Sequence, residues 1–118
     1  MNIEQRTVGD VLVLSISGDI TLRGNGATQI ADRVRSEIQQ GHNRVVLDLG
    51  RVRYVDSAGL GELVQAWSAA RNRGGAMKLL NVTRRLNDLL VLTRLETVFD
   101  CFDRESVALS SFQPPPAR

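Results

Sequence analysis

Apolar residues along this chain recur at every second position in some stretches and at every third or fourth in others, which is the pattern of strands alternating with helices. A Gly9-Asp10 pair separates a weak strand pattern at residues 3–8 from a strong one at residues 11–17. A two-residue turn between two such patterns predicts an antiparallel hairpin. Three further short apolar runs are typical of buried strands, and they lie at residues 44–49, 76–80 and 98–102.

Between these runs, apolar residues recur at every third or fourth position, which predicts helices. Gly41 and Gly74 end the first two apolar stripes, and Thr83 and Asp103 are suited to cap the last two. Strands that alternate with helices are joined by right-handed crossovers and therefore run parallel. The chain is predicted to be an α/β domain with a mixed sheet of about five strands and about four helices. The stripes consist of Ala27, Ile30, Val34 and Ile38; Leu60, Leu63, Val64, Trp67 and Ala70; Leu86, Leu89 and Leu90; and Val107 and Leu109.

The length of 118 residues suits one domain, which at this size buries roughly two-thirds of the surface that its unfolded chain exposes. No internal repeat or domain linker divides the sequence. Residues 114–116 are prolines, and proline cannot extend the last predicted helix. We therefore expect a single domain at residues 1–112 and a proline-rich C-terminal tail at residues 113–118.

Composition and charge exclude several classes of function. The net charge is only +2, the arginines are spread along the chain, and three Phe, one Tyr and one Trp offer few platforms for stacking bases. Direct binding of nucleic acid is therefore not expected. No apolar run approaches the roughly 20 residues of a membrane-spanning helix, and the N-terminus lacks the order of a signal peptide. We expect a cytoplasmic protein without membrane insertion.

Cys101 is the only cysteine, so neither an intramolecular disulfide nor a metal site built from paired cysteines is expected. It lies in the apolar run at residues 98–102 and is predicted to be a small buried residue of that strand. His42 is the only histidine and is predicted to be a solvated loop residue. The sequence therefore predicts no metal and no cofactor.

The most informative stretch is the junction at Asp56-Ser57, where the strand-like part of the chain ends and a helix begins. Asp and Ser both accept hydrogen bonds from the N–H groups at a helix start, so either residue can be the N-cap. If Asp56 is the cap, the Ser57 hydroxyl is left free at the first helical position. Unpaired N–H groups and the positive end of the helix dipole tolerate a phosphate there. Ser57 is thus a candidate phosphorylation site, although an ordinary capped turn has the same sequence.

The helix that follows this junction is predicted to bury its apolar stripe and to present a nearly uncharged outer face. Gly59 and Gly61 lie near its start, where each costs about 1 kcal/mol of helix propensity relative to alanine. Close packing of the helix on the sheet explains them, and so does close approach by another molecule; both explanations stay open. The residues predicted to point outward are Ala58, Glu62, Gln65, Ala69 and Asn72.

Two enzyme-like patterns are present, and both are incomplete. Ser57 as a nucleophile needs a base, but His42 lies in the loop before the preceding strand. Gly24 and Gly26 begin a pattern similar to a dinucleotide fingerprint, but Gln29 stands where its third glycine belongs. We therefore expect a binding protein rather than an enzyme.

The sequence around the junction resembles the STAS domain as found in bacterial anti-sigma factor antagonists. The resemblance rests on an apolar strand, a short loop and an Asp-Ser-x-Gly-Leu motif before a helix, here residues 46–49, 52 and 55–61. It extends to residues 17–20, 77–80 and 92–95 and so covers nearly the whole chain. The resemblance implies a STAS-type fold for the predicted α/β domain.

The resemblance also implies a function. In similar proteins the serine matching Ser57 is phosphorylated by an anti-sigma factor that is also a serine kinase, and a PP2C-like phosphatase reverses the modification. The unphosphorylated antagonist binds the kinase and releases the sigma factor. Thr21 departs from the pattern, because many members have a carboxylate there. The implied partner-binding residues are Asp19, Thr21, Asp56, Ser57, Ala58, Gly59, Leu60, Gly61, Glu62 and Gln65.

STAS domains serve two other functions, and the sequence leaves both open. One is as a small subunit of a lipid ABC transporter that binds the ATPase through the helix after the Asp-Ser junction. The other is as a scaffold domain of a stress-signalling assembly.

Overall fold

A computed structural model describes residues 2–21 and 29–112. It contains a five-stranded sheet whose strands lie side by side in the order in which they occur along the chain. The first two strands are antiparallel, and each later strand is parallel to its neighbour, which confirms the predicted hairpin and mixed sheet. The strands are β1 (Asn2–Val8), β2 (Val11–Ile20), β3 (Arg44–Val55), β4 (Ala76–Leu80) and β5 (Cys101–Phe102).

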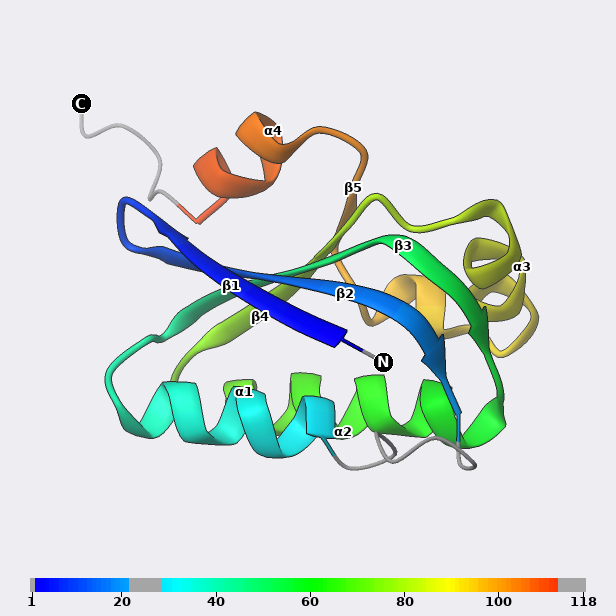
Figure 1. Ribbon diagram of the computed structural model, residues 1–118, viewed down its shortest axis with the longest axis horizontal. Coiled ribbons are helices and arrows are strands. Elements are labelled where there is room, and N and C mark those ends of the chain that lie inside the picture. The colour runs from blue at the N-terminus through cyan, green and yellow to red at the C-terminus, as the bar shows by residue number, and fades with distance from the viewer. Residues whose placement is uncertain (1, 22–28, 113–118) are drawn as a thin grey trace.

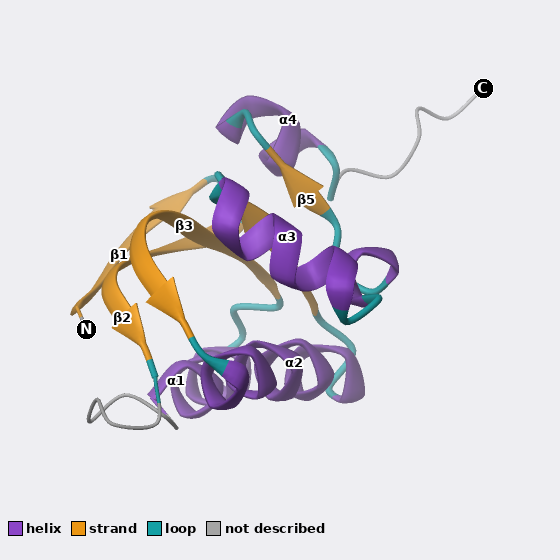
Figure 2. Cartoon of the chain, turned by 90° about the vertical axis from the view of Figure 1, so that its right-hand side faces the viewer, coloured by secondary structure: helices purple, strands orange, loops and turns teal. Residues whose placement is uncertain are grey.

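The helices cover the two faces of the sheet unequally. Two of them, α1 and α2, lie side by side along one face, and α4 lies on the opposite face (Figure 1). A third helix, α3, packs beside the far end of β3 (Figure 2). The helices are α1 (Gln29–Gln39), α2 (Ser57–Asn72), α3 (Arg84–Leu92) and α4 (Glu105–Ser110), with a short 3₁₀ helix η1 (Leu95–Thr97).

Alternate residues of the central strands contribute to two separate hydrophobic cores, because successive side chains of a strand point to opposite faces of the sheet. Leu47 of β3 belongs to the larger core, which includes Leu63 of α2. Val46 belongs to the smaller core, which includes Ala108 of α4. All four side chains are fully buried. Burial on both faces explains why these strands appear in the sequence as continuous apolar runs.

The structure corrects the predicted length of β3. We expected this strand at residues 44–49 with a loop to follow, but it continues to Val55. The added part pairs with β2 as far as Ile20 opposite Val55, whereas pairing with β4 stops where Asp48 meets Leu80. Residues 50, 51, 53 and 54 are all exposed, so this half of the strand lacks the alternation that marks a half-buried strand.

The last predicted strand is also shorter than expected. Part of the expected run at residues 98–102 follows η1 as a turn, and only Cys101–Phe102 is strand. Cys101 is exposed, so its predicted burial is wrong. Asp103 is not the cap of the last helix either, because α4 begins one residue later, after Arg104. The predicted tail at residues 113–118 lies outside the described residues.

Candidate functional site

The junction between β3 and α2 is built around Asp56. Its backbone is extended, with φ −95° and ψ −177°, and its Oδ1 accepts a hydrogen bond from the N–H of Gly59 at 2.7 Å. Its carbonyl oxygen accepts the first helical hydrogen bond, from Leu60 N at 2.8 Å. Of the two residues that the sequence allowed as N-cap, Asp56 therefore fills the position.

Ser57 is the first residue of α2 and is exposed. Its hydroxyl takes part in no hydrogen bond within residues 2–21 and 29–112. The first turn of α2 contains no acidic residue, and the Asp56 carboxylate that caps it lies at the positive end of the helix dipole. The predicted free hydroxyl at the first helical position is confirmed.

The two glycines of α2 have different explanations. A Cβ on Gly59 would lie 1.9 Å from the carbonyl oxygen of Ile20, so this glycine allows the helix to pack against the end of β2. A Cβ on Gly61 would meet no atom within 4 Å, and Gly61 is exposed. Close packing therefore accounts for Gly59 only, and Gly61 leaves the helix surface open to another molecule.

The end of β2 lies beside the junction. The N–H of Asp56 donates to the carbonyl oxygen of Ile20 at 3.3 Å. Asp19 and Thr21 precede and follow Ile20 in the sequence, so both lie next to the junction. The Asp19 Oδ1 lies 3.5 Å from Arg53 Nε in an exposed ion pair, and Thr21 is half-buried. The structure thus places Asp19, near the end of β2, and Thr21, which directly follows β2, beside the start of α2.

The predicted outward orientation of Glu62 is wrong. Its side chain is only 4% exposed, and its Oε1 accepts a hydrogen bond from the backbone N–H of Ala31 in α1 at 2.9 Å. The helix α2 therefore has two covered sides, one against the sheet and one against α1. Burial raises the pKa of the Glu62 carboxyl, the Ala31 hydrogen bond opposes this, and Asp32 adds to it. The predicted partner-binding residues that are exposed on α2 are Ser57, Ala58, Gly61 and Gln65.

The structure separates Ser57 from the histidine that an enzyme would need. His42 precedes the start of β3 and Ser57 follows its end, so a strand of about 40 Å lies between them. The imidazole is not fully solvated, since its Nδ1 lies 3.4 Å from Glu37 Oε1. The glycines at residues 24 and 26 lie outside the described residues. Within the described ranges, no group of three His, Cys, Asp or Glu side chains is arranged to hold a metal ion.

None of the helices in the described part of the chain is both long and apolar enough to cross a bilayer.

This chain is similar in sequence and in fold to several known proteins. It is 25% identical over 118 residues to an anti-sigma F factor antagonist from Paenibacillus polymyxa, with 96% of each chain covered. It shares its fold with a "putative anti-sigma factor antagonist" from Thermotoga maritima, at a TM-score of 0.85 and 24% identity, with 95% of each chain covered. The phosphorylated form of the Bacillus cell fate determinant SpoIIAA gives a TM-score of 0.72 at 18% identity, with 95% of this chain and 100% of that chain covered.

A model of the STAS domain matches residues 2–108 of the chain. The match includes the whole sheet, the Asp56 cap and all of α2. The chain belongs to the STAS domain family.

Proposed function

We propose that this protein is an anti-sigma factor antagonist that binds an anti-sigma factor serine kinase when unphosphorylated and loses that affinity when Ser57 is phosphorylated. The name of the Paenibacillus relative supports the antagonist function. The observation that carries the switch is the geometry of the junction: Asp56 takes the capping position, and the Ser57 hydroxyl is exposed and forms no hydrogen bond within the part of the chain that the structure describes. A kinase requires an accessible hydroxyl of this kind.

The fold tolerates a phosphate on Ser57, but a docked partner does not. Phosphorylation adds about −1.5 to −2 charges at pH 7, and the start of α2 offers unpaired N–H groups and a positive dipole end. In a complex, the same charge must be removed from water next to the Asp56 carboxylate. A loss of about 3 kcal/mol of binding free energy lowers affinity roughly a hundredfold, which is enough to exchange one partner for another.

The proposed binding surface combines the start of α2 with the end of β2. Ser57, Ala58, Gly61 and Gln65 supply the exposed face of the helix. The side chains on this face are small and uncharged, so a partner can approach the helix backbone closely at Gly61. Other residues act from beneath or beside this face: Asp56, Gly59 and Leu60 hold the junction in shape, Asp19 and Thr21 flank it, and the buried Glu62 is left out of the surface.

Phosphorylation assays test the proposal. The protein is incubated with ATP and candidate anti-sigma factor kinases, and the modified residue is mapped by mass spectrometry in the parent, in Ser57→Ala and in the control Ser36→Ala, which changes an exposed serine on α1. We expect one phosphate on Ser57 in the parent and control, and its removal by a PP2C-like phosphatase. Phosphate on Thr21, or on no residue, would contradict the proposal.

A further inference from the structure

The outer half of β3 has a free edge. Its pairing with β4 stops at Asp48, after which β4 ends and the chain turns away through Asn81 into α3. Residues 51–55 pair with β2 on one side only, and in the described chain no backbone hydrogen bond joins them to α3 or to any other segment on the other side. Such an edge presents a row of unpaired N–H and C=O groups that an added strand can bind.

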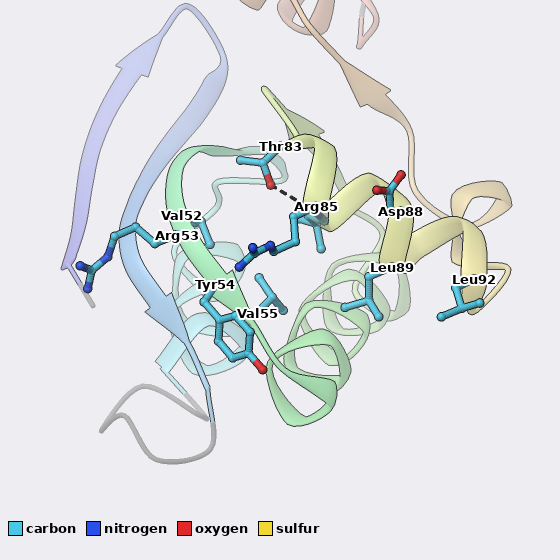
Figure 3. Close-up of a pocket in the computed structure, with 10 residues that line it drawn as sticks. Val52, Arg53, Tyr54, Val55, Thr83, Arg85, Asp88, Leu89 and Leu92 are labelled. Atoms are coloured by element: carbon cyan, nitrogen blue, oxygen red, sulfur yellow. Dashed lines mark hydrogen bonds between the residues drawn. The ribbon is translucent and has the colours of Figure 1, made fainter.

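A groove runs between this edge and α3. Its volume is about 240 Å³, and residues 52–55 line one wall while α3 lines the other (Figure 3). Leu86 and Leu89 lie on the α3 wall, with Leu92 at its end. Small-molecule sites usually enclose about 300–1,000 Å³, so this groove is better matched to one or two apolar side chains of a larger ligand.

Large apolar side chains are exposed around the groove. Tyr54 of the β3 wall is 47% exposed, and Leu92 of α3 is 81% exposed. Val91, the neighbour of Leu92, is 53% exposed. Exposed apolar residues that gather around a concave surface typically mark an interaction site rather than chance exposure.

The positive charge that faces the groove comes from Arg85 (Figure 3). Arg85 on α3 extends its guanidinium across the groove towards β3, whereas Arg53 of the edge strand points away from the groove, over β2 (Figure 3). Arg53 pairs with Asp19 at 3.5 Å, whereas Arg85 forms no ion pair with any residue that the structure describes. The carboxylate on the groove, Asp88, points away from Arg85 in the same view. An acidic ligand complements this surface, and a second copy of the same edge would bring like charges together.

We propose that residues 51–55 of β3 bind an extended acidic segment of a partner protein as an added strand. One apolar side chain of that segment fills the groove between β3 and α3, and one carboxylate pairs with Arg85. Main-chain hydrogen bonds supply the affinity and the groove supplies the selectivity, as in other cases of strand addition. The site ends at Val55, two residues before Ser57, yet it requires neither the Ser57 hydroxyl nor its phosphorylation.

Three capped eight-residue peptides test this proposal. The first consists of four Asp-Val repeats, the second of four Arg-Val repeats, and the third is the acidic peptide with its two central residues N-methylated, which blocks both backbone edges. Binding is followed by NMR titration and by hydrogen exchange of the protein amides. We expect the acidic peptide to bind at least about fivefold more tightly than the basic one and to slow amide exchange within residues 51–55. The N-methylated peptide should not bind.

Charge-reversal variants test whether Arg85 is the residue that pairs with the acidic peptide. Arg85→Glu should reverse the preference between the acidic and basic peptides. The matched control Arg84→Glu, which changes the adjacent α3 arginine outside the groove, should leave the preference intact. Ser57→Ala should bind the acidic peptide as tightly as the parent does. A failure of the proposed phosphorylation switch can therefore be distinguished from a failure of the proposed peptide site.

Several outcomes would overturn the proposal. Equal binding of all three peptides, or slowed exchange outside residues 51–55, would show that no strand is added to β3. Slowed exchange within residues 51–55 that depends on protein concentration without peptide would identify a second copy as the occupant.

Discussion

Glu62 of α2 accepts a hydrogen bond from the backbone N–H of Ala31, within the first turn of α1. The carboxylate thereby satisfies one of the unpaired N–H groups at the start of a different helix, a role that a capping side chain normally has within its own helix. Because Glu62 follows Ser57 by little more than one turn, this contact fixes the start of α2 relative to α1. The positions of the two helices are therefore coupled near the candidate phosphorylation site.

The Glu62 contact predicts a pH-dependent difference in stability. Burial raises the pKa of this carboxyl in the folded protein above its unfolded value, so its ionised form lowers stability at pH values above the folded pKa. Glu62→Gln keeps an acceptor for Ala31 N–H and has no charge to bury. We expect the variant's free energy of unfolding at pH 7 to equal or exceed that of the parent. The difference should vanish as the pH falls and Glu62 is protonated, which urea unfolding across the pH range measures.

A matched variant controls for the hydrogen bond itself. Glu62→Ala leaves the Ala31 N–H without its acceptor and should cost about 1–3 kcal/mol. If Glu62→Gln were as unstable at pH 7 as Glu62→Ala, the charge itself would stabilise the fold and this account of the contact would be wrong.

Alanine substitutions at the two α2 glycines should have opposite effects on stability. Gly59→Ala places a methyl group against the Ile20 carbonyl oxygen, 1.9 Å away, and should cost several kcal/mol. Gly61→Ala meets open space and should stabilise the helix by up to about 1 kcal/mol. Thermal unfolding of both variants measures these changes. A destabilised Gly61→Ala would show that this glycine has a structural function after all.

Gly61→Ala also tests the proposed binding surface. If a partner approaches the α2 backbone at this point, the added methyl group should weaken kinase binding while the fold stays intact. Ala69→Gly serves as a comparison farther along α2. Unchanged kinase affinity in Gly61→Ala would remove this residue from the surface.

Lys78 of β4 contacts the residues that directly follow α4. Its Nζ donates to Ser111 Oγ at 2.9 Å, lies 4.6 Å from the ring centre of Phe112 and 5.7 Å from that of Phe102, and its side chain is 13% exposed. Lys78→Met keeps the apolar stem but removes these interactions. We expect a loss of about 1–3 kcal/mol and faster hydrogen exchange in α4, with little change in α2. Equal exchange rates in α4 of parent and variant would contradict this function for Lys78.

Sequence reasoning predicted the features that depend on local chemistry. The Gly9-Asp10 hairpin, the order of strands and helices, the Thr83 cap and the exposed Ser57 hydroxyl are all confirmed. Each depends on residues close together in the chain, where turn propensity and apolar spacing act directly.

The features that were missed depend on contacts between distant segments. Glu62 is buried because α1, 31 positions earlier in the sequence at Ala31, covers one side of α2, and a helical projection of α2 alone contains no sign of this. The spacing of Gly59 and Gly61 likewise cannot show that only the first faces Ile20. The outer half of β3 was missed because its exposed side chains remove the alternation that identifies a strand.

The most direct test of the switch is the affinity of the cognate anti-sigma factor kinase for purified protein with and without phosphate on Ser57, measured by calorimetry. Circular dichroism of both forms establishes that the fold is the same. The account predicts that the phosphate lowers affinity roughly a hundredfold, with Ser57→Asp showing a smaller decrease in the same direction. Equal affinities for two equally folded forms would contradict the central claim that charge on this hydroxyl determines which partner is bound.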